Sequence, residues 1–554
     1  MRRKENSLKA NKDPTTSKKT KYVVVVGSVI SGVGKGTFTA SLANLLKLAH
    51  GLKVAPLKFD GYLNYDAGTL NPYRHGEVFV LDDGTECDLD LGSYERMINQ
   101  NLTHHNYLTA GKLFKTIIDK ERRGEYLGRD VQFIPHVTNE IKSYVKKLGE
   151  ISDADVVLVE VGGTIGDLEN SYFIEAMREL AYEEGKENIC FINVVYILEP
   201  KSLGEQKTKA AQLGTRRLMG LGIQPDMIVC RSEHPISKKI KEKVSVYSNV
   251  PVDRIISLPD HDVIYEIPLI LAEKKVDEKV CDILGLKFKE KPSNDFKRWE
   301  ELARKMRGVR KEVNIAITGK YTDVHDAYIS ILSTLEHTAP YLNAKVSIKW
   351  IETSKIEKYT DVEEMLKDVN GVIVPGGFGS RGAEGKIMCI RYARENNIPF
   401  LGLCFGFQLA CIEYARNVCG LKNANSTEID PNTKTPIVII LPEKRNLKEM
   451  GGTLRLGGQD VEIKPGTKAH KIYGKTLIRE RFRHRYELNP EYIEVLEKHG
   501  LVFSGKAPKR EIMQILELPN HPFFMATQFH PEFTSKPLNP SPIFKAFLEA
   551  ALKV

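Results

Sequence analysis

One recurring pattern restricts the fold of this chain: short apolar runs, with little polar alternation, separated by helical segments. The runs lie at residues 22–26, 156–161, 190–198 and 227–230, and a second α/β pattern has predicted strands at 313–317, 345–351, 371–374 and 398–403. Such runs are typical of strands buried on both faces, and the intervening helices are typical of parallel crossovers. The pattern predicts an α/β fold with two doubly wound, mostly parallel sheets.

Composition divides the chain into four parts. Residues 1–21 are polar, charged and interrupted by proline, which predicts a disordered basic tail. Residues 286–312 are basic and polar, and they suit a linker or connecting helix. We expect residues 22–285 and 313–554 to form the two α/β domains, a number that a length of 554 residues accommodates.

The net charge is concentrated at the N-terminus, where residues 1–21 contribute +6 of the formal +9. This arm has no aromatic residue and no binding motif, so we expect a solvated tail and no nucleic-acid partner. No apolar run reaches the roughly 18 residues of a membrane span, so no membrane partner is expected. The eight cysteines include no CxxC pair, which favours a reducing, cytoplasmic setting.

A glycine-rich turn follows the first apolar run. Residues 27–37 read Gly-Ser-Val-Ile-Ser-Gly-Val-Gly-Lys-Gly-Thr and lead into a helix predicted over residues 35–48. Backbone N–H groups of the turn, the helix N-terminus and Lys35 can bind phosphate oxygens. The turn is not a strict Walker A motif, because Gly36 replaces the usual Ser or Thr. It still predicts a nucleotide phosphate site rather than a plain glycine-rich turn.

A nucleotide phosphate needs magnesium, and two acidic segments offer carboxylates for it. Glu160 ends an apolar run, at the edge where ligands bind in parallel sheets. Residues 88–92, Asp-Leu-Asp-Leu-Gly, place alternating acids on one face of a predicted strand. Alone, either acid is more often a solvated side chain or a helix cap. Together with the glycine-rich turn they predict a metal site.

The second half contains the parts of a cysteine nucleophile site. Cys404 stands between the apolar run at 400–403 and a predicted helix, which is the arrangement of a nucleophile elbow. His530 is the candidate base and Glu532 its orienting group. Residues 375–379, Pro-Gly-Gly-Phe-Gly, can supply backbone N–H groups to an oxyanion. Because three such motifs occur in one domain, a catalytic site is favoured over the alternative that Cys404 is an inert buried cysteine and His530 a core histidine.

These motifs carry a resemblance. Residues 313–554 resemble a class I glutamine amidotransferase domain through PGGFG, GLCFGFQ and FHPE, and residues 22–554 are similar to the CTP synthase family. The segments that carry the second likeness are residues 68–69, 72, 75–80, 88–92, 94–96, 120–124, 162–167, 204–209, 423–428 and 483–486. The resemblance implies a P-loop, dethiobiotin-synthetase-like synthase domain followed by a glutaminase domain.

The resemblance also implies a reaction. ATP would phosphorylate the 4-oxygen of UTP, and ammonia from L-glutamine, passing inside the protein, would displace that phosphate to give CTP. It further implies Mg2+ as a cofactor, GTP as an allosteric activator, CTP as an inhibitor that competes with UTP, and a homotetramer.

The site residues implied by the resemblance form several groups. Those for ATP are Gly32, Val33, Gly34, Lys35, Gly36, Thr37, Lys58, Asp90, Pro259, Asp260 and His261. Those for UTP and CTP are Ser31, Asp167, Leu168, Glu169, Lys207, Thr208, Lys209, Ala210, Ala211, Gln212 and Lys243. Those for glutamine are Gly377, Phe405, Gly406, Phe407, Gln408, Glu428 and Arg485. Catalysis falls to Cys404, His530, Glu532 and Lys35, magnesium to Asp90 and Glu160, the ammonia entrance to Pro72, His75 and Val78, and GTP activation to the lid segment 381–385.

The chain departs from the family pattern at a few positions. Gly61 stands where a proline is usual, and Ala210 and Ala211 replace a proline and a threonine. Ser28, Asn170 and Phe405 replace a glycine, a serine and a leucine. None of these changes removes a charged catalytic group. The two alanines remove a rigid turn and a hydroxyl, so we expect them to bear on UTP affinity and CTP feedback.

Two other function classes are open to a chain with these parts. A P-loop amidotransferase acting on a non-nucleotide substrate, such as a cobyrinate-type amidase, also pairs such a loop with a glutaminase. The segments at 88–96 and 207–209 speak against it. A P-loop switch ATPase would have no use for Cys404, His530 and Glu532.

Overall fold

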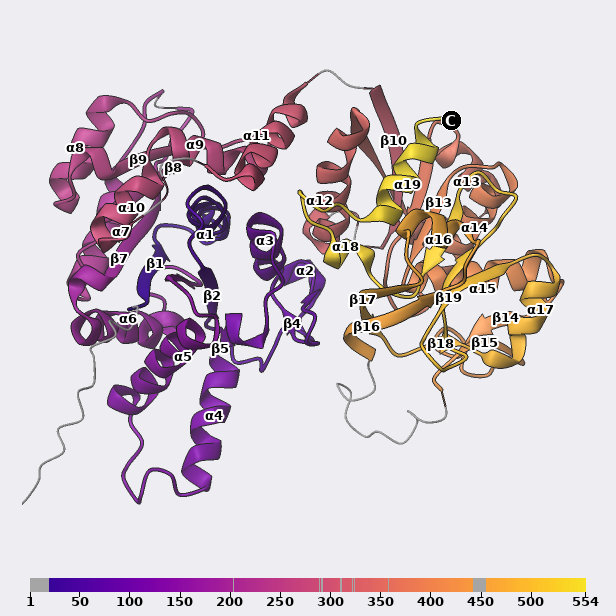
Figure 1. Ribbon diagram of the computed structural model, residues 1–554, viewed down its shortest axis with the longest axis horizontal. Coiled ribbons are helices and arrows are strands. Elements are labelled where there is room, and N and C mark those ends of the chain that lie inside the picture. Colours follow the sequence, from indigo (N-terminus) through magenta and orange to yellow (C-terminus); the bar gives the residue numbers. More distant parts are fainter. Residues whose placement is uncertain are drawn as a thin grey trace, which may run out of the picture.

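We describe a computed structural model of the chain. It describes residues 19–441 and 455–554, except residues 203, 288, 290, 291, 309, 310, 321, 323 and 357. Residues 1–18, most of the expected tail, lie outside the described residues. Two α/β halves lie side by side, with helix α11 on the segment between them (Figure 1). No helix of the described part is both long and apolar enough to cross a membrane.

A seven-stranded parallel sheet forms the first half, with the strand order β5-β2-β6-β1-β7-β8-β9. Its strands are β1 (Lys21–Gly27), β2 (Val54–Asp60), β5 (Tyr107–Thr109), β6 (Val156–Val161), β7 (Ile189–Tyr196), β8 (Met227–Ser232) and β9 (Ile255–Pro259). Alternate residues of β1 face opposite sides: Val23 and Val25 join one core cluster, and Val24 and Val26 join another. Burial on both faces explains why this strand reads as one continuous apolar run.

Helices cover both faces of this sheet. The face of Val23 is covered by α1 (Lys35–Asn44), α3 (Leu89–Ile98), α9 (Ile267–Glu273) and α10 (Val276–Leu284). The face of Val24 is covered by α4 (Ala110–Arg122), α5 (Thr138–Ile151) and α6 (Ser171–Glu184). Beside β7, β8 and β9 lie α7 (Lys209–Gly220) and α8 (Lys238–Ser248). A short helix, α2 (Pro72–His75), precedes the hairpin of β3 (Phe79–Val80) and β4 (Glu86–Cys87).

A nine-stranded sheet forms the second half, with the order β11-β10-β12-β13-β21-β20-β19-β16-β17. Its strands are β10 (Lys311–Gly319), β11 (Ala344–Glu352), β12 (Gly371–Val374), β13 (Phe400–Leu403), β16 (Arg455–Ile463), β17 (Leu477–His484), β19 (Val502–Lys506), β20 (Met513–Glu517) and β21 (Phe524–Thr527). The first five in that order are parallel, as predicted, and the last four add antiparallel pairs. Short loops suffice for antiparallel neighbours, and β19, β20 and β21 follow one another in the chain without an intervening helix.

Helices also cover both faces of the second sheet. On one face lie α13 (Tyr359–Leu366), α14 (Ala383–Glu395), α15 (Phe405–Asn417) and α17 (Ile493–Lys498). On the other lie α12 (Ile329–Thr338), α16 (Lys468–Tyr473) and α19 (Pro542–Ala551). The single-turn α18 (Pro531–Thr534) follows β21, and a small separate sheet contains β14 (Ala424–Ser426), β15 (Thr435–Ile439) and β18 (Glu487–Leu488).

The basic segment between the halves contains α11 (Asn294–Arg307). The Ser293 side chain caps its N-terminus by accepting a hydrogen bond from the Phe296 N–H. Trp299 is buried in the first half and donates its indole N–H to the Tyr265 carbonyl at 2.9 Å. Arg298 reaches the Leu538 carbonyl of the second half at 3.2 Å. The helix therefore contacts both halves, while the domain boundaries at 285 and 313 stay predictions.

Candidate functional site

The glycine-rich turn places a buried lysine at the end of β1. Gly32 and Gly34 adopt positive φ angles of 70° and 89°, which glycine accommodates without strain. Lys35 is 6% exposed, and its Nζ donates to the Gly163 carbonyl at 2.7 Å. A Cβ on Gly27 would lie 2.7 Å from Lys35 Cδ, so Gly27 lets this side chain fold back over the turn. Burial lowers the pKa of Lys35, and Glu160 opposes that shift.

Carboxylates gather around a second buried lysine next to this turn. Lys58 Nζ lies 3.0 Å from Glu160 Oε1 and 3.8 Å from Asp60 Oδ1, and it also contacts the Asp90 carboxylate. Burial disfavours the charged lysine, but Asp90 and Glu160 outweigh burial and raise the pKa of Lys58. Burial and the neighbouring carboxylates raise the pKa of Asp60, and its Oδ2 has no hydrogen-bond partner among the described residues. Three carboxylates around one lysine form an acidic, oxygen-rich site that fits a hard cation such as Mg2+.

The prediction that residues 88–92 form a strand is wrong. Asp88 is the N-cap of α3, and its Oδ1 accepts a hydrogen bond from the Asp90 N–H at 3.1 Å. Aspartate is favoured at this position because its carboxylate satisfies a free N–H group of the first turn. Asp90 is therefore a first-turn helix residue that points toward the glycine-rich turn of residues 27–37, called the phosphate turn below after its predicted role. A Cβ on Gly36 would lie 2.5 Å from Asp90 Oδ1, which explains why glycine follows Lys35.

Cys404 occupies the turn between β13 and α15 with φ 52° and ψ −98°. A positive φ is costly for a residue with a side chain, and it holds the sulfur out of the turn. The turn is tight, because a Cβ on Gly406 would lie 2.2 Å from the Val374 carbonyl oxygen. Cys404 Sγ is 3.6 Å from the Arg483 carbonyl oxygen, and Gln528 Nε2 is 3.7 Å from the sulfur.

His530 and Glu532 form a buried pair beside Cys404. His530 Nδ1 lies 2.7 Å from Glu532 Oε1. Burial disfavours the imidazolium, but the charges of Glu532 and Cys404 outweigh burial and raise the pKa of His530 to about 10. His530 Nε2 makes no hydrogen bond of ordinary geometry among the described residues, although the Cys404 thiol is close enough to help raise the pKa of the ring. A Cβ on Gly376 would lie 3.0 Å from His530 Cε1 and 3.7 Å from Cys404 Cβ, so the PGGFG segment borders both side chains.

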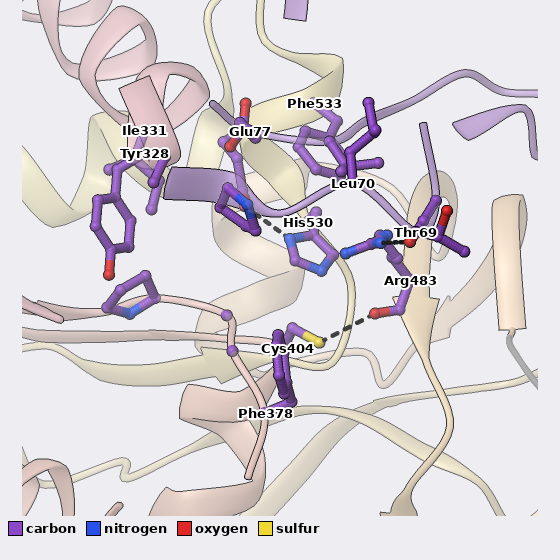
Figure 2. A pocket seen from close by; sticks show the side chains of 18 residues that line it. Thr69, Leu70, Glu77, Tyr328, Ile331, Phe378, Cys404, Arg483, His530 and Phe533 are labelled. Carbon is purple, nitrogen blue, oxygen red and sulfur yellow. Dashed lines mark hydrogen bonds and ion pairs between the residues drawn. The ribbon is translucent and has the colours of Figure 1, made fainter. Parts of the chain in front are cut away.

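A cavity of about 300 Å³ opens in front of this cysteine (Figure 2). Its second-half wall includes Cys404, His530, Glu532, Gly376 and Gly377. Its first-half wall is the segment after β2, with Gly68, Thr69, Leu70, Pro72, Glu77 and Val78. Cys404 thus faces residues of the other half of the chain across one shared space.

Comparisons with known proteins match both halves of the chain. The family model for the CTP synthase N-terminus matches residues 21–286, and the model for class-I glutamine amidotransferase matches residues 323–550. A CTP synthase of Thermococcus gammatolerans is 52% identical over 533 residues, which is 96% of this chain and 98% of that protein. The chain belongs to the CTP synthase family. A CTP synthase of Archaeoglobus fulgidus is 50% identical over the same shares of the two chains, 96% and 98%.

A solved structure from the CTP synthase family is also similar to part of this chain. It is the glutaminase domain of Trypanosoma brucei CTPS with bound acivicin. It is 38% identical, covers 44% of this chain and 94% of that chain, and has a TM-score of 0.42.

The residues that the CTP synthase resemblance implies for the pyrimidine nucleotide lie in the glycine-rich turn, in the 167–169 turn, at and just before the start of α7, and on α8. Gly61 packs against the 167–169 turn, since a Cβ there would lie 2.8 Å from the Glu169 carbonyl oxygen. Thr208 stands at the N-cap position of α7 without a capping hydrogen bond from its side chain, and its hydroxyl accepts from Gln212 Nε2 at 2.8 Å. Lys207 pairs with Glu205, and the hydrogen bond and charge of Lys207, followed by the charges of Lys239 and Lys243, lower the pKa of Glu205. Lys207 and Lys243 therefore share one neighbourhood, while Leu168 is exposed and Ala211 is buried.

The CTP synthase resemblance implies that residues 259–261 lie beside the adenine of ATP. The structure connects them to the phosphate turn through Arg231, a residue that the sequence analysis did not predict. Arg231 Nη2 lies 2.6 Å from Asp260 Oδ1, and its Nη1 donates to the Pro259 carbonyl at 3.0 Å. A Cβ on Gly34 would lie 3.2 Å from Arg231 Nε. Arg231 therefore connects Asp260 to the turn.

Among the glutamine residues implied for a CTP synthase, Gly377 lines the cavity. Glu428 Oε1 accepts from the Gly379 N–H at 3.1 Å, and the Gln408 side chain donates to the Tyr486 carbonyl at 2.8 Å. Phe407 is fully buried in the core. Lys386 was not predicted. Its buried Nζ donates to the Pro375 carbonyl at 3.3 Å, at the start of the PGGFG segment.

Proposed function

We propose that the chain catalyses the ATP-dependent amination of UTP to CTP with ammonia released from glutamine. The observation that carries this function is the shared cavity, in which the cysteine, histidine and glutamate of the second half face residues 68–78 of the first half. A glutaminase that acted alone would have no need of a wall from a nucleotide-binding half.

In the second half, Cys404 is the nucleophile for the glutamine amide carbon. His530 holds the proton that leaves with ammonia, and Glu532 fixes the ring through Nδ1 and stabilises its charge. Backbone N–H groups of the PGGFG segment are placed to stabilise the tetrahedral oxyanion. Water then releases glutamate from the acyl-enzyme. We assign glutamine binding to the region of Gly377, residues 405–408, Glu428 and Arg485.

In the first half, the chemistry is the transfer of the ATP γ-phosphate to the UTP 4-oxygen, followed by displacement of that phosphate by ammonia. Lys35 and the N-terminus of α1 would hold the phosphates. Asp90 and Glu160 would hold Mg2+, which supplies positive charge to the transferring phosphate. Lys207, Lys209 and Lys243 can pair with the UTP triphosphate. We further propose activation by GTP through the 381–385 segment, inhibition by CTP, and assembly into a homotetramer.

The test is CTP formation from UTP and ATP, measured with glutamine and with ammonium chloride, each with and without GTP. We expect CTP from both nitrogen sources and faster glutamine-dependent synthesis with GTP. Absence of CTP with either source would contradict the function. Equal rates with and without GTP would contradict the activation alone.

A further inference from the structure

Strand β17 sends three arginines from the second half into the first. The strand is the edge of the nine-stranded sheet, and it lies on the side of that half that faces α2, α3 and β4 (Figure 1). Because strand side chains alternate, Arg479, Arg481 and Arg483 share one face. Each pairs with an acid of the first half, namely Asp82, Glu95 and Glu86. We call Arg479, Arg481 and Arg483 the arginine row.

The middle pair of the arginine row is the most constrained. Arg481 Nη1 lies 2.8 Å from Glu95 Oε2 and Nη2 lies 3.1 Å from Glu95 Oε1, a bidentate pair. The two side chains are 0% and 1% exposed, whereas those of Arg479 and Asp82 are 51% and 34% exposed. Water can replace the outer pair at little cost, but it cannot reach the middle one.

The backbone of the same strand positions two residues of the glutaminase site. The Arg481 carbonyl accepts the His530 N–H at 2.8 Å. The Arg483 carbonyl accepts from Cys404 Sγ at 3.6 Å, as Figure 2 shows. Side chains of the arginine row therefore hold the first half while their carbonyls hold the base and the nucleophile.

In the first half, Glu95, the partner of Arg481, belongs to α3. Glu95 lies on that helix five positions after Asp90, which contacts Lys58 and packs against Gly36 of the phosphate turn. Glu95 also accepts the Leu102 N–H at 2.7 Å, which fixes the end of the helix. One rigid helix thus contacts the phosphate turn at its start and Arg481 near its end.

We propose that Arg481 is a positioning residue that couples the nucleotide site to the glutaminase site. This inference rests on the proposed function. A shift of α3 when nucleotides bind beside Asp90 moves Glu95, and the buried bidentate pair obliges Arg481 to follow. The Arg481 carbonyl then resets the position of His530 relative to Cys404. Glutamine is hydrolysed fastest when the phosphate turn is occupied.

The test compares Glu95→Gln with Asp82→Asn, its matched control at the exposed pair. Two rates are measured for each: glutamine hydrolysis with and without ATP and UTP, whose ratio is the nucleotide stimulation, and CTP formation from ammonium chloride. For Glu95→Gln we expect the stimulation to fall about tenfold, within the roughly 5–150-fold range of allosteric couplings. We expect its ammonia-dependent CTP formation to stay within about twofold of wild type. Asp82→Asn should keep both values.

The Glu95→Gln variant leaves the buried Arg481 charge without a partner, which destabilises the fold. A double variant, Glu95→Gln together with Arg481→Gln, has no buried charge and serves as the second test. It should fold, as a melting curve checks, and should also lose the stimulation. Arg481→Lys, which keeps the charge but cannot form the bidentate pair, should lose it as well. An unchanged stimulation in the folded variants, a wild type without stimulation, or a parallel loss of ammonia-dependent synthesis would each overturn the coupling. A wild type that makes no CTP from ammonia would instead overturn the proposed function.

Discussion

His530 Nδ1 and Glu532 Oε1 lie 2.7 Å apart, and both side chains are buried. This contact fixes the ring so that Nε2 faces the cavity of Cys404. It also accounts, with the cysteine, for the high pKa of His530. The charged state of the base is therefore set by a residue two positions away in the sequence.

Glu532→Gln removes the charge that opposes burial, so the pKa of His530 should fall from about 10. With a pKa of about 10, His530 stays protonated as the pH rises to about 10. With a lower pKa, it loses its proton at a lower pH. The alkaline limb of glutamine hydrolysis should move to lower pH, and the maximal rate should fall about 10²–10⁴-fold. The pH profile of glutaminase activity checks this, and a lower rate with an unmoved alkaline limb would contradict it.

Gly36→Ala should impair synthesis from ammonia as strongly as from glutamine. Its Cβ would lie 2.5 Å from Asp90 Oδ1, which must then move away from Lys58 and the phosphate turn. A displacement of this kind can cost on the order of 100-fold in rate. Gly220→Ala is the matched control, because nothing lies within 4 Å of a Cβ there. Wild-type CTP formation by Gly36→Ala would contradict the placement of Asp90.

Lys386→Met should stabilise the protein more at pH 6 than at pH 9.5. Burial, reinforced by the charge of Lys320, lowers the pKa of Lys386 from 10.5 to about 7. Below pH 7 both folded and unfolded chains carry the proton, so the full cost of burying the charge applies. Between pH 7 and 10.5 the unfolded chain binds more protons, and the cost fades as pH rises. Urea unfolding at the two pH values should show a difference of at least about 1 kcal/mol. An equal gain at both would contradict the shift.

Much of the fold could be predicted because strands buried on both faces form continuous apolar runs in the sequence. The strands β6 and β12 have the predicted bounds, and Cys404, His530 and Glu532 come together as their motifs indicated. The strand β2 was missed because Pro56, Lys58 and Asp60 interrupt its apolar run, although all seven residues are buried. The predicted strand at residues 88–92 is wrong because alternating acids fit a strand and a capped helix start equally well.

The contacts between the halves could not be predicted, because their signal is not local. Arg481 and Glu95 are 386 residues apart, and Arg483 and Glu86 are 397 apart. The sequence of β17, Leu-Ile-Arg-Glu-Arg-Phe-Arg-His, looks like a solvated edge strand. Its middle arginine, Arg481, is buried only because the other half supplies Glu95 as a partner.

The most direct test of the account is CTP formation by Cys404→Ala and Lys35→Ala, each with glutamine and with ammonium chloride. We expect Cys404→Ala to lose glutamine-dependent synthesis by at least about 10³-fold while it keeps synthesis from ammonia, because the nucleophile serves only glutamine. Lys35→Ala should lose synthesis from both sources. Loss of ammonia-dependent synthesis in Cys404→Ala, or its survival in Lys35→Ala, would contradict the division of the reaction between the two halves.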